Sequence, residues 1–316
     1  MRLGDLGEFG LIERIERAAR RLPRSRAVVI GIGDDAALLR PGSGEDVAVS
    51  TDSLVEGVHF RFATQSPKTV GRRALSVSLS DLAAMGARPL GFTVALVAPP
   101  DLAVGTLDAL LAGLLHGARA FACPLVGGNL SAGSELSLAV TVLGAVERGR
   151  ALRRCGARAG DRILVTGSLG GAALELARAE RGLGRIRSVP IPRLAAGRAL
   201  ARLGGVGACI DVSDGLGADL GHLLAGGRLS AEIDPARLPR PRGFATGCAR
   251  LGLDADRIAL GGGEDYELLF TLRPGGPGLA LLARRLGVPV REIGRVVAGR
   301  PAGRRGAGWR HFEAPR

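Results

Sequence analysis

Three segments that lie far apart in this chain share one build, and they limit the folds that the sequence can adopt. They read GIGDDAAL from Gly31, IDVSDGLGADL from Ile210 and GGGEDYEL from Gly261. Each places carboxylates where an apolar strand meets a turn or a helix start, which is where α/β proteins gather ligand-binding groups. Glycine lets the backbone approach a phosphate closely, and a helix N-terminus supplies N–H donors. The pattern favours an α/β fold that assembles one binding site from distant segments.

Further acids occur in apolar surroundings outside these three segments. Ser50, Thr51 and Asp52 end an apolar run that predicts a strand, and Asp81 lies among small residues in a helix predicted over residues 67–87. Two carboxylates about 4 Å apart repel each other by about 4 kcal/mol at an effective dielectric constant of 20, so grouped acids require a counter-charge. A hard divalent cation is the usual one. Taken singly, GDD is also an ordinary turn and STD an ordinary helix cap.

The basic residues restrict the chemistry further, because Lys68 is the only lysine in a chain with a formal net charge of +13. A Walker A lysine and the strand lysine of protein kinases are therefore excluded, and a Schiff base is possible only at Lys68. Any bound phosphate must be neutralised by arginine, by backbone N–H groups or by metal. Nucleic acid is not expected as a partner, because the arginines are scattered and only 3% of the residues are aromatic.

The cysteines and the apolar segments bear on the compartment. Four widely spaced cysteines form no CxxC pair, so the sequence predicts neither a zinc site nor a disulfide framework. The first ten residues lack the apolar core of a signal peptide, and the longer apolar segments are interrupted by charged residues before they could span a bilayer. We expect a soluble, cytoplasmic protein without a membrane partner.

A length of 316 residues suits two domains, each with its own core. The polar and basic stretch from Glu147 to Asp161 predicts the boundary, which gives a domain over residues 1–149 and another over 150–316. A short amphipathic helix is predicted over residues 8–22, and PLVGGNLSAG is predicted to be a short strand that leads into a glycine turn. Strands then alternate with helices in both halves, which favours mixed sheets covered by helices.

Seven segments in order resemble the thiamine-monophosphate kinases, which belong to the ATP-binding superfamily of aminoimidazole-ribonucleotide synthetase. The segments are GIGDDAAL, STDSLVEGVHF, LSDLAAMGARP, LVGGN, LRRCGARAGDRILVTG, IDVSDGLGADLGHL and GGGEDYELLFT. The resemblance implies a two-domain α/β (α+β) fold with an N-terminal, mixed-sheet nucleotide-binding domain and a C-terminal α/β domain. It also implies a homodimer that phosphorylates thiamine monophosphate to thiamine diphosphate with ATP and several Mg²⁺ ions.

The resemblance assigns roles to individual residues. Those on metal-ligand positions are Asp35, Ser50, Thr51, Asp52, Asp81, Asn129, Asp211 and Asp214, among which Asp35, Asp52, Asp81 and Asp211 also form the predicted catalytic set. Those on ATP contacts are Gly128, Asn129, Arg154 and Ser213. Those on thiamine contacts are His59, Glu264 and Trp309. Direct phosphoryl transfer needs positioning and charge neutralisation and no protein nucleophile, which agrees with the acid-rich segments.

One residue departs from the family pattern, because Asn129 stands where many relatives carry an aspartate. An amide oxygen still coordinates Mg²⁺ but adds no charge, so we expect weaker binding of one ion. Two alternatives stay open. Another ATP-dependent enzyme of the superfamily, of the ring-closing synthetase type, would share the acidic turns, although STDSLVEGVHF argues against it. A non-catalytic nucleotide- or metal-binding module is the second.

Overall fold

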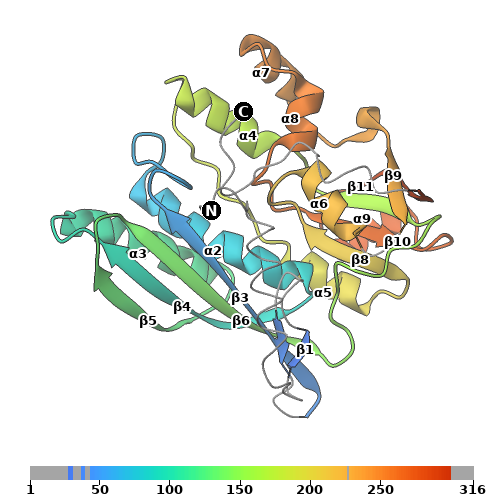
Figure 1. The fold of residues 1–316 in the computed structure, drawn as a ribbon, viewed down its shortest axis with the longest axis horizontal. Helices are drawn as coiled ribbons and strands as arrows, with labels where there is room; N and C mark the ends of the chain where they lie inside the picture. The colour runs from blue at the N-terminus through green and yellow to red at the C-terminus, as the bar shows by residue number, and fades with distance from the viewer. Residues whose placement is uncertain (1–27, 31–36, 40–42, 226–227, 300–316) are drawn as a thin grey trace, which may run out of the picture.

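The computed structural model describes residues 28–30, 37–39, 43–225 and 228–299, which form two β-sheets with helices packed between and around them (Figure 1). The first sheet has the strand order β1-β2-β3-β6-β4-β5. Its strands are β1 (Val28–Ile30), β2 (Ala37–Leu39), β3 (Glu45–Val55), β4 (Arg88–Ala98), β5 (Leu125–Ala132) and β6 (Ser137–Glu147). All neighbours pair antiparallel except β4 and β5, which are parallel, so the predicted mixed sheet is present.

The strand β5 confirms the strand predicted within PLVGGNLSAG, since it runs through Gly127 and Gly128 and ends before Gly133. Gly128 pairs with Val94 of β4, and a Cβ atom at position 128 would collide with the Val94 carbonyl group. Glycine here permits close approach of two strands rather than a reversal of the chain. Asn129 therefore lies on an edge strand instead of in a loop.

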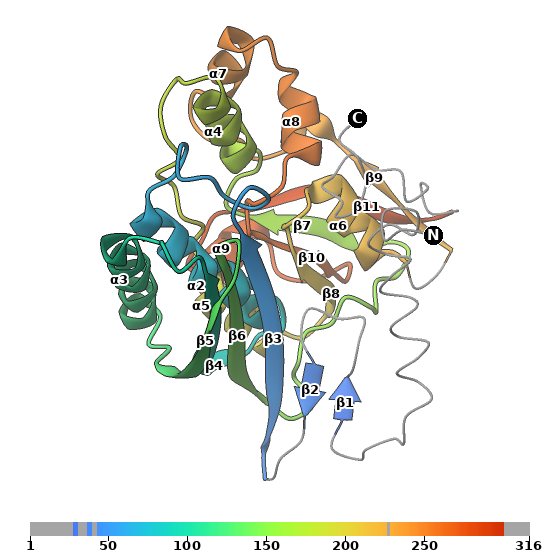
Figure 2. The same cartoon turned by 60° about the vertical axis from the view of Figure 1, so that its left-hand side comes forward.

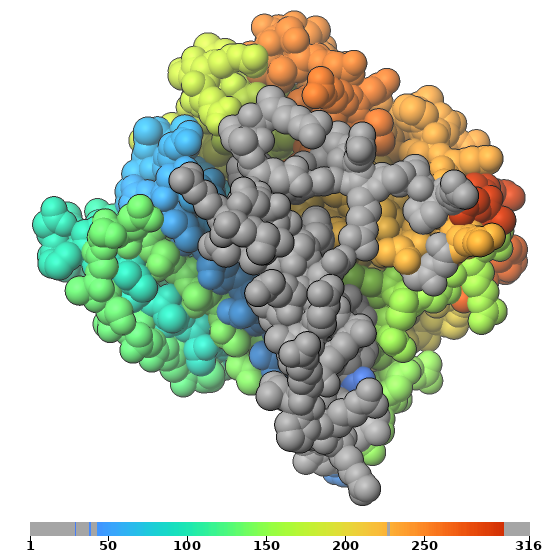
Figure 3. Space-filling view, in the orientation of Figure 1, coloured from blue at the N-terminus to red at the C-terminus, as the bar shows by residue number. Residues whose placement is uncertain are grey.

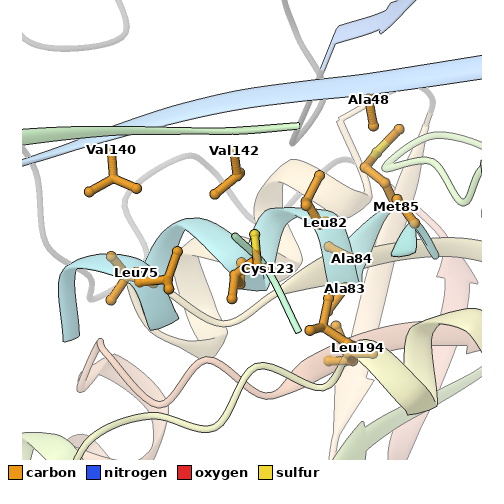
Figure 4. Close-up of a cluster of buried hydrophobic side chains, with 14 of the residues drawn as sticks. Ala48, Leu75, Leu82, Ala83, Ala84, Met85, Cys123, Val140, Val142 and Leu194 are labelled. Carbon is orange, nitrogen blue, oxygen red and sulfur yellow. The ribbon is translucent and has the colours of Figure 1, made fainter. Parts of the chain in front are cut away.

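The helix α2 (Pro67–Ala84) is the centre of the structure. It begins where the Ser66 hydroxyl accepts a hydrogen bond from Thr69 N at 3.1 Å and Pro67 occupies the first turn, an arrangement typical of helix starts. The helix packs against β3 and β6 of the first sheet and against α3 (Val104–Ala120). On its other side it packs against α5 (Leu194–Arg202) and against β8 (Val206–Asp211) of the second sheet. Figure 4 shows Leu75, Leu82 and Met85 facing Val140, Val142 and Ala48 of the first sheet, with Leu194 on the opposite side. One helix thus joins both halves of the chain.

The second sheet is entirely antiparallel and has the order β8-β10-β7-β11-β9. Its strands are β7 (Arg162–Thr166), β8 (Val206–Asp211), β9 (Leu229–Ile233), β10 (Leu268–Leu272) and β11 (Val290–Ala298). The predicted boundary at residue 149 falls in the connection between β6 and β7 and remains a prediction.

The remaining helices cover the second half of the chain. They are α4 (Gly171–Glu180), α6 (Leu216–Leu223), α7 (Phe244–Arg250), α8 (Ala255–Gly261) and α9 (Leu279–Leu286), with a 3₁₀ turn over Pro235–Arg237. α4, α7 and α8 group at one end of the molecule (Figure 2). The helix predicted over residues 8–22 lies outside the described residues. No helix in the described ranges combines the length and the apolar character needed to cross a bilayer.

Candidate functional site

The first part of the candidate site lies where β3 faces α2. Residues of a strand alternate between its two faces, and Asp46, Ala48 and Leu54 are buried on the face toward α2. Ser50 and Asp52 have the same parity and share that face. The Ser50 hydroxyl donates a hydrogen bond of 2.5 Å to Asp81 Oδ2 of α2. Two segments that are 31 residues apart in sequence therefore bring their polar groups together at this point.

Asp211 ends β8 and joins this group from the second half of the chain. Its side chain is buried, and burial raises the pKa of its carboxyl group to about 6, with Asp52 adding to the rise. The positive charge of Arg154 lowers that pKa, as does the hydroxyl group of Ser80. Ser80 is fully buried and makes no hydrogen bond of ordinary length and angle within the described residues. Asp52 and Asp211 thus influence each other beside one arginine.

The loop after β8 carries Ser213 and Asp214 and is held by one acid of α6. Asp219 Oδ2 accepts hydrogen bonds from the backbone N–H groups of Ser213 at 3.1 Å, Asp214 at 3.2 Å and Gly215 at 3.1 Å. The Asp219 side chain is buried, so three donors at the helix start converge on a carboxylate shielded from water. Asp219 fixes the direction in which Ser213 and Asp214 leave the strand.

The segment from Gly261 to Glu267 lies against that loop. Glu264 N donates to Ser213 O at 2.7 Å, and Tyr266 N donates to Val212 O at 2.8 Å. Both Glu264 (φ +67°) and Tyr266 (φ +50°) have left-handed backbone conformations, which side chains other than glycine rarely adopt. The carboxylate of Glu264 meets Arg73 of α2, with 2.5 Å between Arg73 NH2 and Glu264 Oε1. Backbone strain at this place is therefore combined with a contact between the two halves of the chain.

The two acids that follow Glu264 have structural partners. Asp265 Oδ2 accepts a hydrogen bond of 2.6 Å from Gly170 N at the start of α4, and burial raises the pKa of the Asp265 carboxyl group to about 7. Glu267 is buried and pairs with Arg193, whose guanidinium group donates to both carboxylate oxygens at 2.7 and 2.5 Å. Burial also raises the pKa of Tyr266 well above its usual value, with Glu264 as the next largest cause. Asp265 and Glu267 are therefore engaged within the second half of the chain.

His59 lies in the turn that follows β3. Its Nδ1 atom accepts a hydrogen bond of 3.1 Å from Val55 N, so Nδ1 is unprotonated in this arrangement and Nε2 carries the proton of the neutral ring. The ring is half-buried, and Phe60 and Phe62 beside it have ring centroids 5.5 Å apart. The Nδ1 atom of His59 thus stabilises the turn that follows β3.

Three predicted residues are not brought to this group by the described structure. Thr51 has the opposite parity to Ser50 and Asp52, and its hydroxyl accepts a hydrogen bond of 3.0 Å from the Thr141 hydroxyl on the outer face of the sheet. Gly128 is in register with Asp52 but is separated from it by β6 and β4, which corresponds to about 14 Å at the usual strand spacing. Asn129 is exposed and donates to the Ser131 hydroxyl at 3.0 Å.

The donor set fits Mg²⁺ in chemical type, because carboxylate and hydroxyl oxygens are the ligands that hard cations prefer. The raised pKa of the buried Asp211 carboxyl group, with Asp52 adding to the rise, marks a place where acids gather beside the positive charge of Arg154. Yet no three His, Cys, Asp or Glu side chains within the described ranges come together as a finished metal centre. Such a set suits ions held partly by substrate phosphates. Asp35 and Trp309 lie outside the described residues.

Sequence reasoning missed Arg73, Gln65 and Asp219. The signal for Asp219 was present, since an acid four residues after Gly215 on the first turn of a helix is a usual partner for free N–H groups. Arg73 gave no local signal, because its partner Glu264 is 191 residues away.

Comparison with known proteins agrees with this architecture. The family model for the AIR synthase related protein, N-terminal domain, matches residues 33–146, and that for the C-terminal domain matches residues 158–305. The chain is 36% identical to a thiamine-monophosphate kinase of Synechococcus elongatus over 319 residues, covering 93% of this chain and 90% of the relative. It is 38% identical to a thiamine-monophosphate kinase of Escherichia coli over 334 residues, covering 98% and 99%. A solved structure of AaThiL complexed with AMPPCP and TMP superposes with a TM-score of 0.81 at 32% identity, covering 99% of both chains.

Proposed function

Because this chain belongs to the AIR synthase related family and is a kinase of the thiamine-monophosphate kinase type, we propose that it transfers the γ-phosphoryl group of ATP to thiamine monophosphate. The product is thiamine diphosphate. The observation that carries the proposal is the meeting of Asp52 and Asp211 beside Arg154, on segments from both halves of the chain. Acids that would repel one another in isolation are suited to a reaction that gathers phosphates and their cations.

We propose Mg²⁺ as the cofactor, held by Asp52, Asp81, Asp211 and Asp214 with Ser50, and by Asp35 as the sequence predicts. Bound there, Mg²⁺ would supply positive charge to neutralise the phosphate groups. Arg154 supplies positive charge next to Asp211 and is suited to orient a phosphate group. Ser213 offers its hydroxyl, since its backbone N–H already serves Asp219. Glu264, His59 and Trp309 are proposed to receive the thiamine part, whose cationic ring favours a carboxylate and an aromatic face.

We also propose that the active form is a homodimer that meets along β5. This edge strand exposes Leu125, Val126 and Leu130, with 42, 61 and 76% of their surfaces accessible. An apolar groove of about 630 Å³ lies beside them against α3, and Figure 3 shows that α3, β4 and β5 form one margin of the molecule. Long exposed apolar edges invite pairing with another chain. A second copy at this edge would place Gly128 and Asn129 at the subunit interface.

The activity is tested by incubating the purified protein with ATP, Mg²⁺ and thiamine monophosphate and following thiamine diphosphate by chromatography. We expect product formation that depends on all three components. An Asp211→Asn variant is the matched control, because it keeps the shape of a buried side chain and removes its charge. ATP binding without any product would support a non-catalytic module instead. Ring closure of an aminoimidazole precursor, assayed in parallel, would support a synthetase.

The dimer is tested by light scattering coupled to gel filtration. We expect the mass of two chains for the wild-type protein and of one chain for a Leu130→Asp variant, because a charge on the apolar edge must be desolvated on pairing. Val104→Asp is the control, since Val104 is equally exposed, with 72% of its surface accessible, but lies at the start of α3 outside the groove. A wild-type monomer at assay concentration would contradict the dimer and leave the activity proposal intact.

A further inference from the structure

Arg73 lies inside the protein between the two halves of the chain. Its side chain is only 4% exposed, and both ends of its guanidinium group have partners. NH2 contacts Glu264 Oε1 at 2.5 Å, and NH1 donates to Gln65 Oε1 at 2.6 Å. An arginine held at both terminal nitrogens in a buried place has one orientation, because its planar group cannot rotate without losing a bond.

Gln65 is itself fixed by a segment from the second half. Its side chain is 2% exposed, its backbone forms a bridge with Ile186, and its carbonyl oxygen accepts a hydrogen bond of 2.8 Å from Arg185 NH2. Arg185 NH2 also donates to Phe62 O at 2.6 Å. The acceptor that orients Arg73 is therefore anchored independently of Glu264.

Glu264 is the exposed end of this arrangement. Its side chain is 42% exposed, and its second oxygen, Oε2, accepts no hydrogen bond from the described residues. Its backbone is held in the left-handed region by the bond to Ser213 O, so the position of its Cβ is set by the loop. The contact with Arg73 determines the side-chain torsions and adds a restraint to this loop beside the bond to Ser213. Without that contact the carboxylate would rotate, and its charge would lack a neighbour of opposite sign.

We propose that Arg73, oriented by Gln65, is a positioning residue that directs Glu264 Oε2 toward the thiamine part of the substrate. Arg73 acts through Glu264 and does not itself contact the reacting phosphates. The inference rests on the proposed function for the identity of the substrate, while the contact itself does not. Because Arg73 and Gln65 contact Glu264 and the segment around Ile186, we expect the effect to be confined to the substrate that Glu264 is proposed to hold.

The experiment compares the KM values for thiamine monophosphate and for ATP in Arg73→Met, Arg73→Lys and Gln65→Leu. For Arg73→Met we expect the KM for thiamine monophosphate to rise about 10- to 100-fold. The KM for ATP and kcat should each stay within about twofold of the wild-type values. Lysine at position 73 keeps the positive charge without the planar guanidinium group, so Arg73→Lys should show a smaller rise in the KM for thiamine monophosphate. Gln65→Leu should raise the same KM by about 3- to 10-fold, since the guanidinium group keeps one partner.

Arg162→Met is the matched control. Arg162 forms a comparable ion pair with Glu292, with 2.7 Å between Nε and Oε2 and exposures of 15 and 18%, in the second sheet away from Glu264. It should lower thermal stability without separating the two KM values. The double variant Arg73→Met with Glu264→Gln should bind thiamine monophosphate no worse than Glu264→Gln alone, because Arg73 then has nothing to position.

Hydrogen exchange of the peptide over residues 262–266 gives a readout without turnover. We expect faster exchange in Arg73→Met and Gln65→Leu than in the wild-type protein and in Arg162→Met. Equal rises of both KM values, additive effects in the double variant, or unchanged exchange would each overturn the inference. If the wild-type protein makes no thiamine diphosphate, the proposed function fails. The exchange experiment then still tests whether Arg73 holds Glu264 in place. Should Arg73→Met not fold, Arg73→Lys and Gln65→Leu carry the same comparison.

Discussion

Two adjacent loops of the candidate site are ordered in different ways. The loop over residues 213–215 is held by Asp219, four to six residues further along the same chain segment. In the loop over residues 262–266, the Glu264 carboxylate is held by Arg73, which is 191 residues away in the other half of the chain. The first loop can form as soon as α6 forms, whereas the second can be completed only after the two halves have packed. The residues proposed to face the nucleotide thus have local support, and the acid proposed to face thiamine has long-range support.

The largest effect is expected from removing the local support. Asp219→Ala leaves three backbone N–H groups without their acceptor in a buried place, which should lower the free energy of unfolding by about 2 to 4 kcal/mol. Urea denaturation measures this, and hydrogen exchange should speed up over residues 213–215. Asp219→Asn retains one acceptor oxygen and should lose less. If the alanine variant is as stable as the wild-type protein, the loop is not held by Asp219.

The next effect is a pH dependence of the stability, which comes from Asp265 in the loop over residues 262–266. The folded-state pKa of Asp265 is about 7, above its value of about 3.8 in the unfolded chain, so the folded protein holds this proton more tightly. Stability is therefore favoured at pH 4 and is lost as the pH rises toward 7, by on the order of 2 kcal/mol after allowance for solvent. Melting temperatures of the wild-type protein and of Asp265→Asn should diverge over this range, with the variant relatively more stable at pH 7. Parallel curves would show that Asp265 does not titrate in this way.

How much the sequence can predict follows the same division between local and long-range support. The strand of Ser50 and Asp52, the helix of Asp81 and the turn after Asp211 follow from local patterns of apolar residues, glycine and acids. The close approach of Gly128 to the Val94 carbonyl group does not, because it depends on the neighbouring strand β4. The contact of Arg73 with Glu264 depends on the packing of α2 between two sheets, which no local pattern encodes.

A smaller effect is expected from the two faces of β3. Ser50 donates to Asp81 on the inner face, while Thr51 bonds to Thr141 on the outer face. Ser50→Ala should therefore lower kcat/KM by about tenfold, and Thr51→Val should change it by less than about threefold, because its hydroxyl is directed away from the acids. Titration of activity with Mg²⁺ checks both variants. A stronger loss in Thr51→Val would indicate that the backbone of β3 shifts when its outer hydrogen bond is removed.

The smallest effect concerns the edge strand that carries Asn129. An aspartate there adds one negative charge to an exposed position that already offers an oxygen ligand, so Asn129→Asp should strengthen Mg²⁺ binding by a few-fold and leave kcat nearly unchanged. The comparison of Mg²⁺ activation curves at saturating ATP measures the shift. Asn129 is separated from Asp52 of the same chain by two strands, so a second copy would have to complete this ion's site. The shift should then appear in the dimer and vanish in the monomeric Leu130→Asp background. Unchanged Mg²⁺ dependence in the wild-type dimer would mean that position 129 holds no ion, and a shift that persists in the monomer would place that ion within one chain.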